Sequence, residues 1–200
     1  MAELCRIMGE QPQVATWPFN LSVGNGGYYG LVKYYFGHNH IRRSILSTKG
    51  GPEEEYKFRN FLREKPIRCA LEIGTFKGTA TALLARYAER VITIDKYNFV
   101  DKFPFWTEFG VYDKIDSYVI KDEEDKADLI KNLEFDFAFI DGDHTKTGVK
   151  SDFDLVRKCG RVLFHDYYDD KAQGIVPVVN QLAKTDIVKI QEPFAYWEKR

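Results

Sequence analysis

The chain of 200 residues has few cysteines and no long apolar segment. Its three cysteines (Cys5, Cys69 and Cys159) are isolated and include no CxxC pair, which excludes a disulfide framework and favours a reducing compartment. No run approaches the roughly 18 apolar residues of a membrane-spanning helix. The N-terminus also lacks the basic-then-apolar pattern of a secretory signal. These absences predict a cytoplasmic protein that does not enter a membrane.

The formal net charge is only -1, so no overall field attracts nucleic acid or an anionic membrane. The charges are nevertheless uneven, because residues 1–70 carry 10 basic and 6 acidic side chains, whereas residues 113–154 carry 6 and 13. A hydrophobic fraction of 44% with 30% charged residues is typical of a folded globular chain. The aromatic fraction of 15% is high and suggests either a ligand surface or a large core.

The second and larger part of the chain, residues 66–200, consists of alternating strand and helix patterns. Strands are expected at 69–73, 91–94, 118–120, 135–140, 161–164, 187–190 and 194–197, and helices at 78–89, 125–133, 147–159 and 175–183. This alternation predicts an open, mostly parallel α/β sheet. The last two strands are too close for a helical crossover, so they predict an antiparallel hairpin at one edge.

Residues 1–65 have a different character and are predicted to form a cap or lid on the α/β body. Glycines at 24, 26 and 27 interrupt a segment rich in aromatic side chains. These are Trp17, Phe19, Tyr28, Tyr29, Tyr34, Tyr35 and Phe36. An amphipathic helix is expected at 53–64, with acidic residues in its first turn as the helix dipole favours. An extension that merely covers the sheet edge is an equal alternative.

The turn after the first expected strand carries the first chemical signal. Gly74 and Gly78 allow a sharp turn and a close ligand approach at the carboxyl end of the strand, where open α/β sheets bind ligands. The dinucleotide pattern G-x-G-x-x-G is not met, because Phe76 stands in place of the middle glycine, and no Walker A motif is present. Glu72 places an anion here, which suits a ligand with an ammonium group better than one with phosphates.

Asp95 ends the second expected strand, 21 residues after Gly74. An acidic residue at this position can accept hydrogen bonds from both hydroxyls of a ribose.

The E-x-G-x-x-x-G turn, Asp95 and the segment 139–144 (FIDGDH) together resemble class I S-adenosylmethionine-dependent methyltransferases. Within that class the chain is most similar to small-molecule O-methyltransferases, which include the catechol and macrocin/novobiocin types. The resemblance extends over residues 68–182. It implies a Rossmann-like sheet of seven strands with the last strand antiparallel, helices on both faces, S-adenosylmethionine as cofactor and a small-molecule acceptor.

The resemblance also implies roles for single residues. The methionine end of the cofactor would be held by Glu72, Gly74, Thr75, Phe76, Lys77 and Gly78, the ribose by Asp95 with Lys96 beside it, the adenine by Asp122 and the sulfonium by Asp141. Asp122 heads an acidic cluster and could instead cap a helix. Lys77 could instead be a solvated loop residue.

Carboxylates and histidines follow two neighbouring strands, and parallel strands end at the same sheet edge. Asp141, Asp143 and His144 follow one strand, and His165 and Asp166 follow the next. Oxygen ligands with one imidazole suit Mg²⁺ or Mn²⁺ better than a structural zinc. In the metal-dependent branch of the family, the ligand positions correspond to Asp141, His165 and Asp166. Because His165 replaces the usual carboxylate, a magnesium site is weakened, and either Mn²⁺ or no metal remains open.

Methyl transfer to oxygen requires that the acceptor hydroxyl lose its proton during attack. A histidine titrating near neutral pH is a suitable base. We expect His144 in this role, with Asp143 or His165 as the next candidates. The alternative is that His144 caps the helix that begins near Lys146.

Aromatic side chains are dense in residues 97–109, and Tyr167 and Tyr168 follow the candidate metal ligands. Residues 97–109 could form a substrate or adenine wall, or an irregular loop held in place by its own apolar side chains. The tyrosine pair could line a binding pocket or pack against the body. Three functions follow: a small-molecule O-methyltransferase, a nucleic-acid or protein methyltransferase on the same fold, or a cofactor-binding module without activity. The neutral charge argues against a nucleic-acid substrate, and a homodimer is left open.

Overall fold

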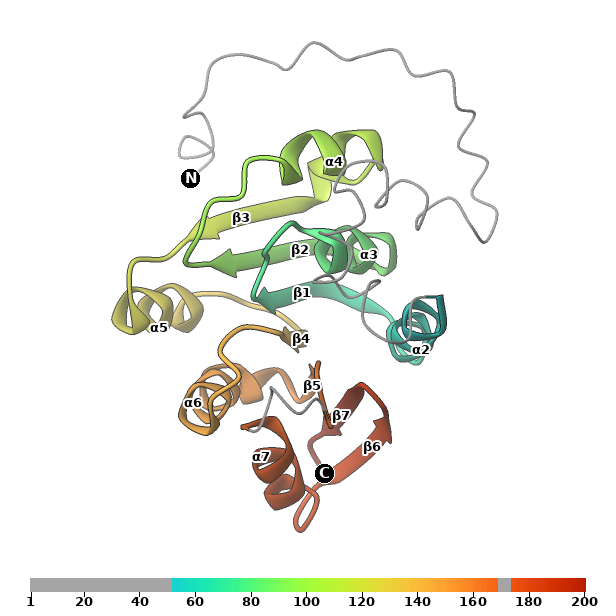
Figure 1. Ribbon diagram of the computed structural model, residues 1–200, viewed down its shortest axis with the longest axis vertical. Coiled ribbons are helices and arrows are strands. Elements are labelled where there is room, and N and C mark those ends of the chain that lie inside the picture. The colour runs from blue at the N-terminus through green and yellow to red at the C-terminus, as the bar shows by residue number, and fades with distance from the viewer. Residues whose placement is uncertain (1–51, 169–173) are drawn as a thin grey trace.

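The computed structural model describes residues 52–168 and 174–200, and within them the strands form one sheet (Figure 1). The strands are β1 (Ile67–Ile73), β2 (Ala88–Asp95), β3 (Ile115–Val119), β4 (Phe137–Ile140), β5 (Arg161–Phe164), β6 (Ile187–Gln191) and β7 (Phe194–Glu198). Their order is β3-β2-β1-β4-β5-β7-β6, with β1 to β5 parallel. Strand β7 runs antiparallel to both neighbours. The predicted Rossmann-like sheet with its C-terminal antiparallel hairpin is confirmed.

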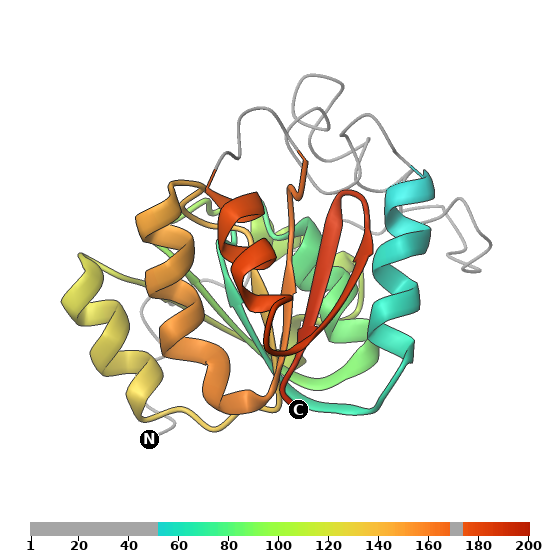
Figure 2. The ribbon, with the colours of Figure 1, turned by 90° about the horizontal axis from the view of Figure 1, so that it is seen from below.

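Helices cover both faces of the sheet, as Figure 2 shows in the edge-on view. The helices are α2 (Pro52–Arg63), α3 (Thr79–Tyr87), α4 (Lys102–Glu108), α5 (Glu123–Lys131), α6 (Lys146–Val156) and α7 (Ile175–Leu182), with short 3-10 turns η1 (Tyr112–Lys114) and η2 (Arg157–Cys159). Successive strand residues point to opposite faces. Ala70 therefore packs in the layer of α2, α3 and α4, and Leu71 packs in the layer of α6 and α7. No helix in these described ranges has the length and apolar character to cross a membrane.

Helix α2 is the described part of the predicted N-terminal cap, and it is packed tightly on the sheet. Phe58, Phe61 and Leu62 are buried in the core, and Phe58 stacks on Phe194 of β7 with ring centroids 5.4 Å apart. Apolar burial of this kind stabilises by about 2 kcal/mol for each large side chain. The remaining cap residues, 1–51, including the aromatic and glycine-rich segment, lie outside the described residues.

The segment 97–109 differs from the loop that the sequence suggests, because it contains helix α4. Pro104 falls in the first turn of this helix, where a missing N–H is tolerated. Phe105 and Trp106 are fully buried, so packing rather than helix propensity stabilises the segment. Tertiary burial explains why the local pattern did not indicate a helix.

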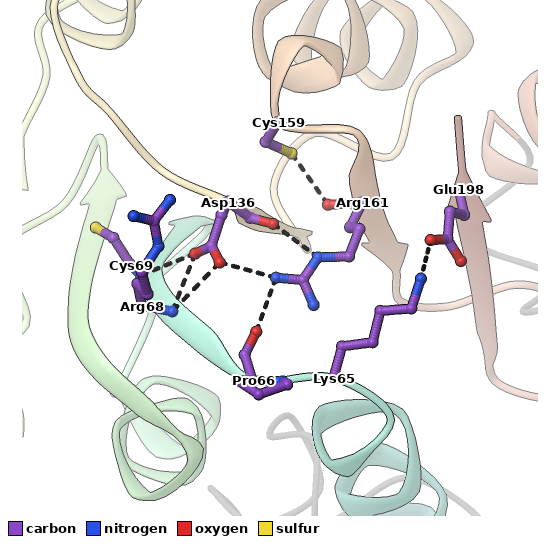
Figure 3. Close-up of polar contacts among 8 residues, drawn as sticks. All are labelled: Lys65, Pro66, Arg68, Cys69, Asp136, Cys159, Arg161 and Glu198. Carbon is purple, nitrogen blue, oxygen red and sulfur yellow. Dashed lines mark hydrogen bonds and ion pairs between the residues drawn. The ribbon is translucent and has the colours of Figure 1, made fainter. Parts of the chain in front are cut away.

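A polar network fastens the strands at the edge where β1, β4 and β5 begin (Figure 3). The Asp136 carboxylate accepts hydrogen bonds from the backbone N–H groups of Arg68 (3.1 Å) and Cys69 (2.9 Å), and from Arg161 Nη2 (2.9 Å). Arg161 also donates to the Pro66 carbonyl at 3.0 Å. These bonds fix the register of the three strands, and hence the positions of the residues at their opposite ends.

Candidate active site

Backbone hydrogen bonds continue the parallel ladder beyond the strand ends and align the predicted site residues. Gly74 N donates to Ile94 O (2.8 Å), Asp141 N to Ile73 O (2.9 Å) and His165 N to Ile140 O (3.1 Å). The first residues after β1, β4 and β5 therefore share one edge of the sheet.

A cleft of about 1540 Å³ opens at this edge. Most predicted site residues line it: Gly74, Thr75, Phe76, Asp95, Lys96, Asp122, Asp141, Asp143, His144, His165 and Asp166. Glu72, Lys77 and Gly78 are not among the lining residues. Typical small-ligand pockets measure about 300–1,000 Å³, so this cleft has room for a cofactor and an acceptor together.

Contacts within the protein account for both glycines of the turn after β1. Gly74 has φ +102°, and a Cβ there would lie 2.1 Å from the Asp141 carbonyl oxygen. Gly78 has φ +73°, and a Cβ there would lie 2.5 Å from Trp106 Nε1, whose indole donates to the Gly78 carbonyl at 2.8 Å. The first glycine thus allows close approach of β1 and β4, and the second allows packing of Trp106.

Glu72 lies beneath this turn instead of in the cleft wall. Its side chain is fully buried and accepts hydrogen bonds from the hydroxyls of Thr81 and Thr93. Burial raises the pKa of Glu72 to about 8, although these two hydrogen bonds oppose the shift. The carboxyl is therefore mostly neutral at pH 7, whereas the sequence suggested an anion at the ligand. We infer that Glu72 acts mainly by holding the two threonines under the turn.

Asp95 lines the cleft, and its ribose contact stays a prediction. Its Oδ2 accepts a hydrogen bond from Phe76 N (2.7 Å), and its Oδ1 accepts one from Tyr97 N (2.8 Å). Each carboxylate oxygen has a second lone pair, so each can still accept a hydrogen bond from a ribose hydroxyl. Exposed Lys96 lines the cleft beside it.

Asp122 lines the cleft and also caps α5, accepting from Asp125 N at 2.9 Å. The capping alternative is thus observed, and the adenine contact stays a prediction.

The aromatic residues near the site divide into two groups. Tyr97 and Phe99 line the cleft with Phe76, whose ring meets Phe99 edge-on at 4.9 Å. Tyr167 is instead buried, with its hydroxyl donating to Asn180 Oδ1 at 3.0 Å, and Tyr168 is half exposed. Neither of this tyrosine pair belongs to the cleft lining in the described structure, so Tyr167 fits the packing alternative.

The carboxylates and histidine after β4 and β5 converge as predicted. His165 Nδ1 lies 3.2 Å from Asp141 Oδ1 and 3.2 Å from Asp166 Oδ1. The other ring nitrogen, Nε2, lies 2.8 Å from Glu54 Oε1 of α2. Burial opposes a low pKa at Asp141, but His165 and His144 lower this pKa to about 2. Asp166 has φ +58°, a sparsely populated backbone conformation of the kind that clusters at functional sites.

His144 stands next to this group and faces the cleft. Its Nε2 lies 3.5 Å from both Asp141 Oδ1 and Asp166 Oδ2. The Asp141 carboxylate raises the pKa of His144, with burial opposing. Thr145, not His144, is the N-cap of α6, since its hydroxyl accepts from Gly148 N at 3.1 Å. The capping alternative for His144 is therefore excluded.

Asp143 has a local structural role in the same loop. Its Oδ1 accepts a hydrogen bond from Thr145 N at 2.8 Å, and its side chain packs against Gly148. This engagement makes Asp143 a weaker candidate for the base than His144.

The three predicted metal ligands fit a divalent ion in their donor set and spacing. One ligand atom from each of Asp141, His165 and Asp166 lies within 4.8 Å of the others. Neighbouring ligand atoms around an octahedral ion with bonds of about 2.1 Å are about 3 Å apart. The 3.2 Å separations from His165 Nδ1 agree with this spacing.

Glu54 is a residue of the site that the sequence did not reveal. It lies 111 positions before His165, in a helix turn where acidic residues are expected for the dipole alone. No spacing in the sequence relates these two residues, since only the packing of α2 brings them together.

Comparison with known proteins agrees with this geometry. Residues 71–167 match the family model described as a methyltransferase domain. No curated protein sequence matches the chain.

Solved structures share the fold at low identity. The O-methyltransferase from Bacillus cereus, in complex with SAH, has a TM-score of 0.64 and 18% identity over 90% of this chain and 94% of that chain. The O-methyltransferase TomG from Streptomyces achromogenes, in complex with SAM, has a TM-score of 0.61 and 19% identity over 86% and 89%. The N-methyltransferase NodS from Bradyrhizobium japonicum has a TM-score of 0.58 and 15% identity over 86% and 97%.

The sheet order, the cleft at the strand ends and the matched family model point to one conclusion. Residues 71–167 match a methyltransferase-domain model, and the sheet has the fold of solved O-methyltransferases, in agreement with the resemblance to class I S-adenosylmethionine-dependent methyltransferases.

Proposed function

We propose that this protein transfers the methyl group of S-adenosylmethionine to an oxygen of a small molecule. The observation that carries the proposal is a single cleft with two chemically different halves. One half has the glycine turn and Asp95, which suit the cofactor. The other half has His144 beside Asp141 and Asp166, which suits deprotonation of a hydroxyl. Solved relatives of the same fold include O-methyltransferases with SAM or SAH bound, which supports this assignment.

Within the cofactor half of the cleft, different residues suit the ribose end and the methionine end of the cofactor. Asp95 accepts both ribose hydroxyls through its remaining lone pairs, and the Phe76, Tyr97 and Phe99 rings provide an apolar wall. Gly74 and Thr75 lie at the methionine end, and Asp141 places negative charge near the sulfonium.

His144 takes the proton in the transfer step through Nδ1, because Nε2 is buried against the carboxylates. The acceptor oxygen attacks the methyl carbon in line, the O–C bond forms as the S–C bond breaks, and the leaving group is neutral S-adenosylhomocysteine. The carboxylates of Asp141 and Asp166, both 3.5 Å from Nε2, stabilise the imidazolium that results.

Asp141, His165 and Asp166 would hold a divalent cation, Mg²⁺ or Mn²⁺. When bound, such an ion would supply positive charge that orients an acceptor hydroxyl and lowers its pKa. A cytoplasmic location and a small-molecule acceptor remain parts of the proposal.

The first test is calorimetry with S-adenosylmethionine and S-adenosylhomocysteine. Binding of both is expected, and no binding at millimolar concentration would overturn the proposed function. Turnover is then followed as S-adenosylhomocysteine release with phenol, catechol and sugar acceptors. Methylation only of protein, nucleic acid or amine acceptors would contradict transfer to a small-molecule oxygen.

The base is tested separately with His144→Gln. We expect kcat to fall by about 10²–10⁴-fold with cofactor affinity nearly unchanged, because general bases contribute about that factor. Thr107→Val is a matched control outside the cleft lining, since the Thr107 hydroxyl bonds only to its own helix at Phe103 O. Full activity of His144→Gln would place the base elsewhere.

A further inference from the structure

A carboxylate from outside the matched domain reaches the candidate metal ligands. Glu54 Oε1 lies 2.8 Å from His165 Nε2, and the exposed fractions of the two side chains are 0% and 4%. Helix α2 is fixed on the sheet by Phe58 and Phe61, so packing determines where Glu54 points. This contact is a buried hydrogen bond rather than a surface ion pair.

The contact with Glu54 determines which way the His165 ring faces. When His165 Nε2 carries the hydrogen, Glu54 Oε1 accepts it, which is the arrangement usual for a metal-bound histidine. Nδ1 then faces Asp141 Oδ1 and Asp166 Oδ1, each 3.2 Å away. Two carboxylate oxygens this close to one ring nitrogen are stabilised by a positive charge among them. That charge is either a metal ion or a second proton on the ring.

We propose that Glu54 is a positioning residue that turns His165 Nδ1 toward Asp141 and Asp166, so that these three bind Mn²⁺ in preference to Mg²⁺. The inference rests on the proposed function, because it takes the cleft to be the site of methyl transfer. Histidine ligands of metals usually donate their other ring N–H to a carboxylate or carbonyl, and Glu54 Oε1 lies at that position, 2.8 Å from Nε2.

The ion preference follows from the donor set. Magnesium favours oxygen ligands, whereas imidazole nitrogen raises affinity for transition ions. A site in which His165 joins two carboxylates therefore discriminates more strongly for Mn²⁺ than a site of three carboxylates would.

The test measures Mn²⁺ binding directly, by electron paramagnetic resonance on the full chain with S-adenosylhomocysteine present and Mg²⁺ as competitor. We expect one Mn²⁺ per chain, bound more tightly than Mg²⁺. In Glu54→Gln the amide can present either oxygen or nitrogen to the ring, so the ring orientation is no longer fixed. We expect Mn²⁺ affinity to fall by about 10–100-fold, the usual cost of losing such a partner. Glu55→Gln is the matched control, because Glu55 is buried in the same turn but pairs with Arg59.

A second variant, His165→Asp, separates the positioning role of Glu54 from general destabilisation of the protein. His165→Asp creates three carboxylates and should shift the preference toward Mg²⁺. Adding Glu54→Gln to His165→Asp should not weaken binding, because no imidazole remains to orient. If Glu54→Gln alone fails to fold, Glu54→Asp replaces it in the same Mn²⁺ titration, because its shorter side chain draws the carboxylate away from His165 Nε2 and should also weaken Mn²⁺ binding.

Three results would overturn it. Absence of Mn²⁺ binding while S-adenosylhomocysteine binds would mean that a ring proton supplies the charge, and the proposed function would stand. Equal Mn²⁺ affinity in Glu54→Gln and Glu55→Gln would remove the positioning role. Failure of the natural chain to bind S-adenosylhomocysteine would overturn the proposed function and this inference together.

Discussion

The buried Glu72 carboxyl should make the stability of the protein fall as pH rises. Its pKa is about 8 in the folded protein against an ordinary value of 4.5, because burial disfavours the charged form. Between these two values the folded state holds one proton more than the unfolded state. Stability linked to this group is therefore fully present below pH 4.5 and is lost as pH rises toward 8.

The size of the effect follows from the shift. One bound proton changes the free energy of unfolding by about 1.4 kcal/mol per pH unit, so the loss from pH 5 to pH 7 is about 3 kcal/mol. Glu72→Gln removes the titration and keeps an oxygen that can accept from Thr81 and Thr93. The amide N–H groups of the variant have no partner at the position of Oε1, which lowers its stability by an amount that does not depend on pH.

The assay is urea unfolding of the natural chain and of Glu72→Gln at pH 5, 6, 7 and 8. The stability of the variant relative to the natural chain should improve by about 3 kcal/mol from pH 5 to pH 7. Other titrating groups cancel in this difference, and Glu124→Gln, an exposed glutamate on α5, provides the background. A difference that stays constant with pH would show that the folded carboxyl titrates normally, and the argument from burial would be refuted.

Two further changes test the packing around the cleft, and a third tests the ribose assignment. Gly78→Ala should destabilise the protein by about 2–4 kcal/mol, because a Cβ at φ +73° would lie 2.5 Å from Trp106 Nε1. Thermal unfolding measures this loss of stability, and an unchanged midpoint would contradict the prediction. Lys126→Met should cost about 3–5 kcal/mol in urea unfolding, since it leaves the fully buried Asp152 carboxylate without its partner at 2.6 Å, and Lys126→Met with Asp152→Leu should recover most of that loss. Asp95→Ala should weaken S-adenosylmethionine binding at least 10-fold in calorimetry, and unchanged affinity would remove the ribose assignment.

The succession of strands and helices along the chain, and the edge that holds the site, could be predicted from the sequence because both depend on local patterns. Continuous apolar runs mark buried parallel strands, and polar residues such as Asp95 and Asp141 mark where the runs end. The strand at 161–164 agrees with β5 residue for residue. Helix α3, by contrast, ends at Tyr87, two residues before its predicted end at residue 89, and β2 begins at Ala88. Alanine-rich composition favoured helix there, and pairing with β1 prevailed.

The parts that the sequence did not reveal depend on burial between distant segments. Glu72 was interpreted as an anion at the ligand because its position at a strand end is visible, whereas its full burial under α3 is not. Helix α4 was missed for the same reason, since Trp106 stabilises it by packing against Gly78. Charge state and long-range contact are properties of the packed molecule, which a single sequence pattern does not encode.

The contact between Glu54 of α2 and His165, the residue after β5, indicates that the site includes residues before the matched region. The matched methyltransferase domain starts at residue 71, yet Glu54 lies against His165 inside the candidate metal site. Phe58 and Phe61 cover the same sheet face that carries Phe139 and Phe194. A fragment beginning at residue 66 would expose that apolar face and leave His165 Nε2 without its acceptor. Helix α2 therefore supplies both a core layer and a polar group of the site, so its removal should cost metal affinity and stability together.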